Sequence, residues 1–182
     1  MSKSPKTSKM GGYIDETLDF KPINIAVLSV TSVASIEEDV SGSALADGVE
    51  VSGHVLADRK IIDENQTIIE HIVGSWINDP GIDAIIVSGG TGPTQKDITL
   101  NAVRPLLETE LEGFNSVWHS IGLKKFGLST ALSRVCLGVA NSSIVFSIPG
   151  GEQACIMGWN DVVSSMLDSR YRPANLIDLI SK

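Results

Sequence analysis

Apolar residues along the chain gather into short, nearly continuous runs separated by segments with helical spacing. The run at 23–30 (INIAVLSV) is β-branched and almost wholly apolar, and the run at 82–88 (IDAIIVS) repeats the pattern. Such runs are typical of strands covered on both faces, as in parallel sheets. A third strand is expected at 54–62.

Two helices are predicted between these strands. The first spans 41–51, where Leu45 and Val49 stand four residues apart, and Gly53 ends it. The second spans 65–76, whose apolar residues recur at helical spacing and form one core-facing stripe. That stripe consists of Ile68, Ile69, Ile72, Val73 and Trp76.

The middle of the chain is less regular. Asp97 can cap a helix that runs through Leu107, because its carboxylate could accept from the first free backbone N–H groups. Pro105 would end or kink that helix early. Residues 108–126 mix acidic residues, glycines and aromatics without a clear period, so they receive no assignment.

The last third predicts a pair of strands and a closing helix. Strands at 135–140 and 144–148 flank a turn at 141–143, a hairpin spacing that makes one strand antiparallel. A helix is expected at 152–167. Strands alternating with helices predict an α/β, three-layer sandwich with a mostly parallel sheet and one antiparallel strand near an edge.

Composition bounds the domain organisation. Residues 1–19 are rich in Ser, Lys, Thr and Gly and have little apolar periodicity, so a disordered tail is expected there. Residues 20–182 then form a single domain. The only two cysteines, Cys136 and Cys155, lack metal-site spacing and are interpreted as buried free thiols.

Charge and hydropathy exclude two classes of partner. The formal net charge of -8 argues against nucleic acid, which requires a basic footprint. No apolar run approaches the roughly 18 residues that cross a bilayer, and no secretory leader is evident, so a cytoplasmic protein without membrane contact is expected.

The strongest local signal is the segment SGGTGPTQKD at 88–97, which follows a predicted buried strand. Its glycines let the backbone adopt positive φ and approach a ligand, so successive N–H groups could point at one anion. It is neither a Walker A motif nor a dinucleotide fingerprint. A tight strand-to-helix turn without a ligand explains the glycines equally well.

Three other features admit both a structural and a functional interpretation. Asp97 is either a helix N-cap or a ligand of a divalent metal held against phosphates. Asp63, after the second strand, is either a turn residue or a second carboxylate of that site. The turn at 147–151 (SIPGG) either simply connects a strand to a helix or presents N–H groups to an anion.

Taken together, these loops resemble the MoaB/MogA family of molybdenum-cofactor biosynthesis proteins. The segment GGTGPTQKD at 89–97 looks like the family's GGTG signature with its trailing aspartate. Asp39-Val40-Ser41-Gly42 is similar to its D-x-S-G segment, and Asp63 falls in a loop that bears a second aspartate. The similarity runs from about 23 to 173 and includes segments 128–134, 148–150 and 170–173.

The resemblance implies a molybdopterin-binding-like fold assembled as a trimer, or as a hexamer of trimers. In active members the terminal phosphate of molybdopterin attacks the α-phosphorus of Mg-ATP, which gives adenylylated molybdopterin and pyrophosphate. The implied catalytic and metal-binding residues are Asp97 and Asp63, with Mg²⁺ as the cofactor and ATP as the co-substrate. The implied substrate-binding residues are Ser88, Gly89, Gly90, Thr91, Gly92, Ser41, Gly42, Ser147, Pro149 and Gly150.

The sequence departs from the family at one place and leaves alternatives open. Ser32 and Ala34 stand where relatives often carry an aspartate and an arginine, which removes one charge pair. The product could pass to a downstream molybdenum-inserting protein. The competing hypotheses are a catalytically silent molybdopterin-binding or scaffold protein and a nucleotide-processing module like the related domain of competence-damage-inducible proteins.

Overall fold

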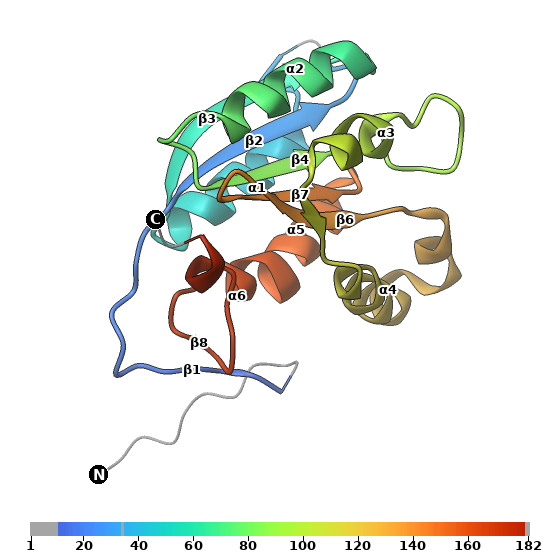
Figure 1. The fold of residues 1–182 in the computed structure, drawn as a ribbon. Helices are drawn as coiled ribbons and strands as arrows, with labels where there is room; N and C mark the ends of the chain where they lie inside the picture. Colours follow the sequence, from blue (N-terminus) through green and yellow to red (C-terminus); the bar gives the residue numbers. More distant parts are fainter. Residues whose placement is uncertain (1–10, 34, 181–182) are drawn as a thin grey trace.

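A mixed six-stranded sheet lies at the centre of the computed structural model, which describes residues 11–33 and 35–180 (Figure 1). The strand order is β3-β2-β4-β7-β6-β5. The first four strands run parallel, whereas β6 is antiparallel to both of its neighbours. The strands are β2 (Asn24–Val30), β3 (Val55–Ile62), β4 (Ala84–Ser88), β5 (Thr109–Glu110), β6 (Cys136–Ala140) and β7 (Ser143–Ile148).

Helices cover both faces of this sheet, which confirms the predicted three-layer α/β sandwich (Figure 1). One face packs on α1 (Val40–Val51), α4 (Gly113–Phe126) and α5 (Glu152–Gly158). The other packs on α2 (Gln66–Ile77) and α3 (Thr99–Val103). Alternate residues of β2 enter the two cores because side chains of a strand point to opposite faces.

The predicted helix at 97–107 is shorter than expected. Helix α3 ends at Val103 and continues as a 3-10 turn, η1 (Arg104–Leu106), which contains Pro105. The N-cap is Ile98, which makes no side-chain capping bond. Asp97 therefore does not cap this helix, because its carboxylate accepts from Thr94 within the preceding loop instead.

Two further regions gain detail beyond the sequence pattern. The unassigned segment 108–126 contributes the edge strand β5 and helix α4, followed by a 3-10 segment η2 (Gly127–Leu132). The closing helix predicted at 152–167 begins and ends as expected but contains a π-helical stretch, η3 (Trp159–Val163), before α6 (Ser164–Met166). A last 3-10 turn, η4 (Ile177–Leu179), follows.

Within the predicted tail at 1–19, residues 13–14 form a strand where composition predicted disorder. Of the predicted tail at 1–19, residues 1–10 lie outside the described residues. Strand β1 (Tyr13–Ile14) pairs antiparallel with β8 (Tyr171–Arg172), and the Asp15 N–H donates to the carbonyl of Arg170 (3.0 Å). Composition could not predict this strand, because the strand that stabilises it, β8, lies at the other end of the chain.

His54 joins this N-terminal segment to the core. Its Nδ1 accepts from the backbone N–H of Ile23 (3.3 Å), and its ring packs between Phe20 and Trp159, with centroids 4.9 and 6.4 Å away. Burial lowers the pKa of His54, and the charge of Asp168 partly opposes that effect. The neutral ring is therefore the form that fits the folded chain.

Acidification should destabilise the protein through His54. Because the folded-state pKa lies below the unfolded value, the stabilisation is fully present above about pH 6.5 and is lost as the pH falls towards the folded-state pKa. Titration of one group can change the free energy of unfolding by at most about 1.4 kcal/mol for each pH unit. Urea unfolding between about pH 7.5 and 5.5 should show a shallower pH dependence for His54→Asn, whose amide oxygen can accept from Ile23 without titrating. Equal slopes for both proteins would contradict this role.

No helix within the described residues is both long and apolar enough to span a bilayer.

Candidate functional site

The carboxyl ends of β2, β4 and β7 meet at one edge of the sheet and enclose a cavity of about 230 Å³. In parallel sheets, ligands bind beyond these ends. The loops after β2 and β7 and the start of α1 complete the wall. The lining residues are Ser29, Val30, Thr31, Val33, Glu38, Asp39, Val40, Ser41, Ser88 and Gly150.

The glycine loop leaves β4 at this edge in a conformation that demands glycine. Gly89 and Gly90 have φ of 94° and 60°. A Cβ on Gly89 would strike the carbonyl oxygen of Val30, and a Cβ on Gly150 would lie 2.7 Å from the Gly89 Cα. The backbones of three loops therefore approach more closely than side chains would allow.

Hydrogen-bond donors at this edge of the sheet stay unsatisfied within the part of the chain that the structure describes. Within 11–33 and 35–180, the N–H groups of Gly90 and Thr91 make no hydrogen bond. Ser88 lines the cavity and is only 2% exposed, yet its Oγ makes no hydrogen bond of normal geometry among these residues. Buried polar atoms are nearly always paired, so this edge suits a ligand that accepts hydrogen bonds.

The D-x-S-G segment starts helix α1 and ties it to the opposite loop. Asp39 is the N-cap, and its Oδ1 accepts from the N–H of Gly42 (2.9 Å). Ser41 Oγ donates to the carbonyl of Gly150 (2.6 Å). A Cβ on Gly42 would collide with the carboxylate of Asp39 and the hydroxyl of Ser29. These contacts fix two of the predicted binding residues, Ser41 and Gly150, against each other.

A buried ion pair supports this arrangement. Asp39 Oδ2 accepts from Ser29 Oγ (2.6 Å) and from Arg59 Nη2 (3.1 Å). The same Nη2 donates to Ser43 Oγ (3.1 Å) and to the carbonyl of Asp39 (3.1 Å). The side chains of Asp39 and Arg59 are 3% and 13% exposed, so the pair is largely shielded from water.

Asp97 closes the glycine loop on itself. Its Oδ2 accepts from the hydroxyl (2.6 Å) and the N–H (2.9 Å) of Thr94. The pKa of Asp97 is lowered by these bonds, most by the one from the Thr94 hydroxyl. The N–H of Gly92 and the charge of Arg134 lower it further. The carboxylate is therefore ionised at neutral pH, as a ligand of Mg²⁺ must be.

Asp63 lies on the same edge of the sheet but at its outer strand. It directly follows β3, is exposed, and its Oδ1 accepts from the N–H of Glu64 (2.8 Å). Asn65 rather than Asp63 caps helix α2. Neither Asp63 nor Asp97 lines the 230 Å³ cavity, and the described part of the chain contains no group of three or more metal-ligating side chains.

The remaining predicted residues occupy distinct places. Thr91 is buried in the loop, and its carbonyl accepts from the N–H of Arg134 (3.0 Å). The Pro149 carbonyl accepts from the Cys155 thiol (3.3 Å), and Ser147 lies wholly buried within β7, away from the cavity lining.

Neither cysteine offers a nucleophile. Both are buried free thiols, as predicted. Cys155 interacts with Ser88, which lines the cavity, and desolvation, followed by the charge of Asp39, raises the pKa of its thiol to about 12. Burial also raises the pKa of Cys136. Both sulfurs therefore stay protonated, which excludes thiolate chemistry at neutral pH.

Sequence reasoning missed much of the wall that follows β2. Thr31, Val33, Glu38 and Val40 line the cavity, and only their position after a buried strand could have indicated this. Of the two residues that depart from the family, Ser32 is exposed, and Ala34 lies outside the described residues. Arg134, which the sequence marked only as part of a segment similar to the family, contacts the glycine loop.

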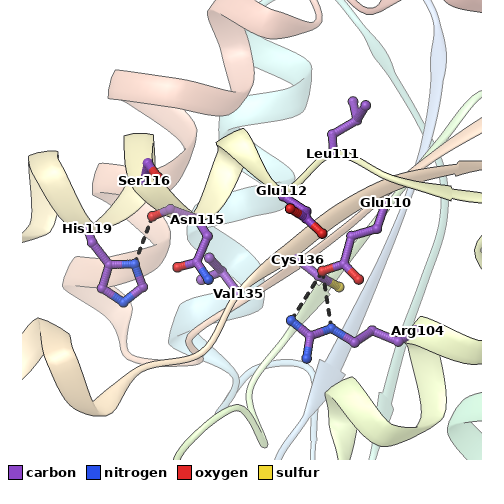
Figure 2. Close-up of a pocket in the computed structure, with 9 residues that line it drawn as sticks. All are labelled: Arg104, Glu110, Leu111, Glu112, Asn115, Ser116, His119, Val135 and Cys136. Carbon is purple, nitrogen blue, oxygen red and sulfur yellow. Dashed lines mark hydrogen bonds and ion pairs between the residues drawn. The ribbon is translucent and has the colours of Figure 1, made fainter.

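A larger cavity of about 650 Å³ opens beside the edge strand β5 and its neighbour β6 (Figure 2). Two of its charged residues, Arg104 and Glu110, form an ion pair across it. Arg104 donates to Glu110 (3.2 Å from Nε to Oε1), and His119 Nδ1 lies 2.8 Å from the Asn115 carbonyl. Among the described residues, none of those predicted to bind substrate lines it. The smaller cavity is therefore the candidate site.

Comparisons with known proteins match most of the chain. A family model described as "Probable molybdopterin binding domain" matches residues 25–169. Molybdenum cofactor biosynthesis protein B of Escherichia coli K12 is 36% identical over 157 residues, which cover 86% of this chain and 92% of the relative.

Two solved structures have the same fold. A crystal structure of molybdenum cofactor biosynthesis protein B aligns with a TM-score of 0.78 and 28% identity, over 81% of this chain and 92% of that one. The tungsten cofactor synthesizing protein MoaB from Pyrococcus furiosus aligns with a TM-score of 0.69 and 27% identity. The alignment covers 76% of this chain and 89% of that one.

Proposed function

This chain belongs to the MoaB/MogA family of molybdenum-cofactor biosynthesis proteins, and we propose that in this pathway it binds molybdopterin and adenylylates it with Mg-ATP. In this reaction a phosphate oxygen of molybdopterin attacks the α-phosphorus of ATP. The bond from that phosphorus to the β-phosphate oxygen breaks, and pyrophosphate leaves. No covalent protein intermediate is required, so the absence of an activated thiol is consistent with the proposal.

The observation that carries the proposal is a set of unpaired donors at one edge of the sheet. The N–H groups of Gly90 and Thr91 make no hydrogen bond within the described residues, and the hydroxyl of Ser88 makes none of normal geometry there. A phosphate accepts several hydrogen bonds, and backbone N–H groups in a glycine loop are suited to donating them. The cavity of about 230 Å³ is smaller than pockets that enclose a whole cofactor, roughly 300–1,000 Å³. We therefore assign it to one end of the ligand.

We assign the Mg²⁺ that this reaction needs to two carboxylates. Mg²⁺ is commonly held by one or two carboxylates together with substrate phosphates and water, rather than by a cage of protein ligands. Asp97 and Asp63 would hold it, and the metal would offset negative charge on the phosphates. Most of the rate enhancement would then come from positioning and electrostatics.

The direct test is an assay with purified protein, molybdopterin and Mg-ATP. We expect equimolar adenylylated molybdopterin and pyrophosphate, measured by liquid chromatography with mass detection. Pyrophosphate release without pterin would instead favour the nucleotide-processing module. Removal of Mg²⁺ with a chelator should abolish product formation while leaving pterin binding measurable.

A second candidate is a molybdopterin-binding or scaffold protein without catalysis. The exposed position of Asp63, away from the cavity lining, favours it. Intact pterin binding with no adenylylated product would establish this alternative.

The quaternary state forms a further part of the proposal. We expect a homotrimer, or a hexamer of trimers, and a transient complex with a downstream molybdenum-inserting protein. Native mass spectrometry of the full chain should give three or six times the mass of the monomer, and a stable monomer would contradict the expectation.

A further inference from the structure

The side chain of Arg134 lies against the glycine loop. Its Nε donates to the carbonyl of Gly92 (2.8 Å), with a longer contact to Thr91 O (3.3 Å), and its Nη2 donates to the carbonyl of Asp97 (2.6 Å). Its backbone N–H also donates to Thr91 O (3.0 Å). One residue thus engages three carbonyl groups that span most of the loop.

The position of Arg134 itself is fixed from the opposite side. His119 on α4 places Nε2 3.0 Å from the carbonyl of Ser133, and the N–H of Ser133 donates to Thr130 O (3.1 Å). A Cβ on Gly122 of α4 would lie 2.6 Å from the Thr130 hydroxyl, so this segment packs tightly on the helix. The guanidinium therefore acts from a rigid support.

The peptide between Thr91 and Gly92 shows what this contact does. In a trans peptide the C=O and N–H point in opposite directions, so a carbonyl held by Arg134 turns the Gly92 N–H away from the arginine. That N–H interacts with the carboxylate of Asp97. Arg134 thus orients the peptide that positions Asp97, although it does not contact the carboxylate in any hydrogen bond among the described residues.

The same contacts have an electrostatic consequence for anion binding. Carbonyl oxygens carry partial negative charge and would repel a phosphate if they faced it. Arg134 binds the carbonyls of residues 91, 92 and 97 and leaves the N–H groups of Gly90 and Thr91 without protein partners in the part of the chain that the structure describes. The positive charge of the guanidinium adds to the favourable potential.

We propose that Arg134 is a positioning residue that holds the glycine loop in its anion-binding conformation and thereby sets the place of Asp97. The proposal rests on the proposed function for its catalytic consequence but not for its structural one. A planar guanidinium with divergent donors fits three separate carbonyls, whereas an ammonium is a compact point charge.

The experiment compares Arg134→Gln and Arg134→Lys with Arg104→Gln in the full chain. Arg104 is a matched control because it is an arginine in a surface ion pair with Glu110 and makes no hydrogen bond to the loop carbonyls among the described residues. Hydrogen exchange is followed by mass spectrometry at 89–97, and binding of inorganic pyrophosphate by calorimetry. For Arg134→Gln we expect loop exchange and the dissociation constant to rise about 10- to 100-fold, as for the loss of hydrogen bonds to a charged group.

Three results separate positioning from a general loss of structure. Exchange in β2 and β4 should stay at the wild-type rate in all variants. Arg134→Lys should show a smaller rise in loop exchange and in the dissociation constant than Arg134→Gln. In a further variant, Arg134→Ala, millimolar guanidinium should restore pyrophosphate binding, whereas sodium chloride should not. The proposal would be overturned if Arg134→Gln and Arg134→Lys both kept the wild-type loop exchange and pyrophosphate affinity. It would also be overturned if Arg104→Gln changed these two quantities as much as Arg134→Gln does.

The catalytic consequence is measured separately. If the wild-type protein adenylylates molybdopterin, Arg134→Gln should lower kcat more than it raises KM, because Asp97 is misplaced. If the wild-type protein has no activity but Arg134→Gln still loosens the loop, the proposed function fails and the positioning role stands.

Discussion

Replacing Asp39 with alanine should lower the free energy of unfolding by about 3–5 kcal/mol, as for other broken buried ion pairs. The variant leaves the Arg59 guanidinium, whose side chain is 13% exposed, without its carboxylate. It also removes the N-cap of α1 and the acceptor of the Ser29 hydroxyl. Urea unfolding monitored by circular dichroism would measure the change.

A double-mutant cycle tests whether the uncompensated charge causes the loss. Asp39→Ala combined with Arg59→Met should be less destabilised than the sum of the single variants, because no buried charge remains unpaired. Additive effects, or a loss below about 1 kcal/mol in Asp39→Ala, would show that the pair contributes little.

Replacing Asp97 with asparagine should lower kcat for adenylylation by about 100-fold or more, a typical cost of losing an electrostatic group in a phosphoryl-transfer site. The amide oxygen can still accept from Thr94, so the loop should keep its shape. The lost property is the negative charge that would hold the metal. Binding of molybdopterin, measured by fluorescence titration, should weaken by less than about tenfold.

The control for this variant is Asp79→Asn. Asp79 occupies a similar exposed turn, where its Oδ1 accepts from the N–H of Gly81 (2.8 Å), but it lies at the opposite end of β4. Its activity should match the wild type. If Asp97→Asn retains full kcat, Asp97 does not hold the metal. If it loses pterin binding and activity together, its role is to shape the loop.

The two aspartates contribute to the site in different ways. Asp39 lines the cavity but is occupied by Arg59, Ser29 and the N-terminus of α1, so its role is to hold the start of that helix against Gly150. Asp97 lies outside the cavity lining, with a carboxylate bonded only within its own loop among the described residues. Stability measurements should therefore respond mainly to Asp39, and turnover to Asp97.

The sequence by itself predicted the sheet, its helical layers and the glycine loop. Strands such as 23–30 and helices such as 65–76 could be predicted because burial places apolar residues at regular intervals along the sequence. The glycines at 89 and 90 were recognisable for a similar reason, since their positive φ is a local requirement.

Only the tertiary structure decided which side chains act together. Asp97 stands where the sequence predicts a helix N-cap, yet its carboxylate accepts hydrogen bonds from Thr94 instead. Arg134 carried no local signal of its partner, yet its guanidinium donates to the carbonyl of Gly92, which is 42 positions away. Tyr13 lay in a segment without apolar periodicity and pairs with Arg172. Local patterns record what each residue prefers among its neighbours in the chain, whereas these contacts depend on partners that only folding brings within hydrogen-bonding distance.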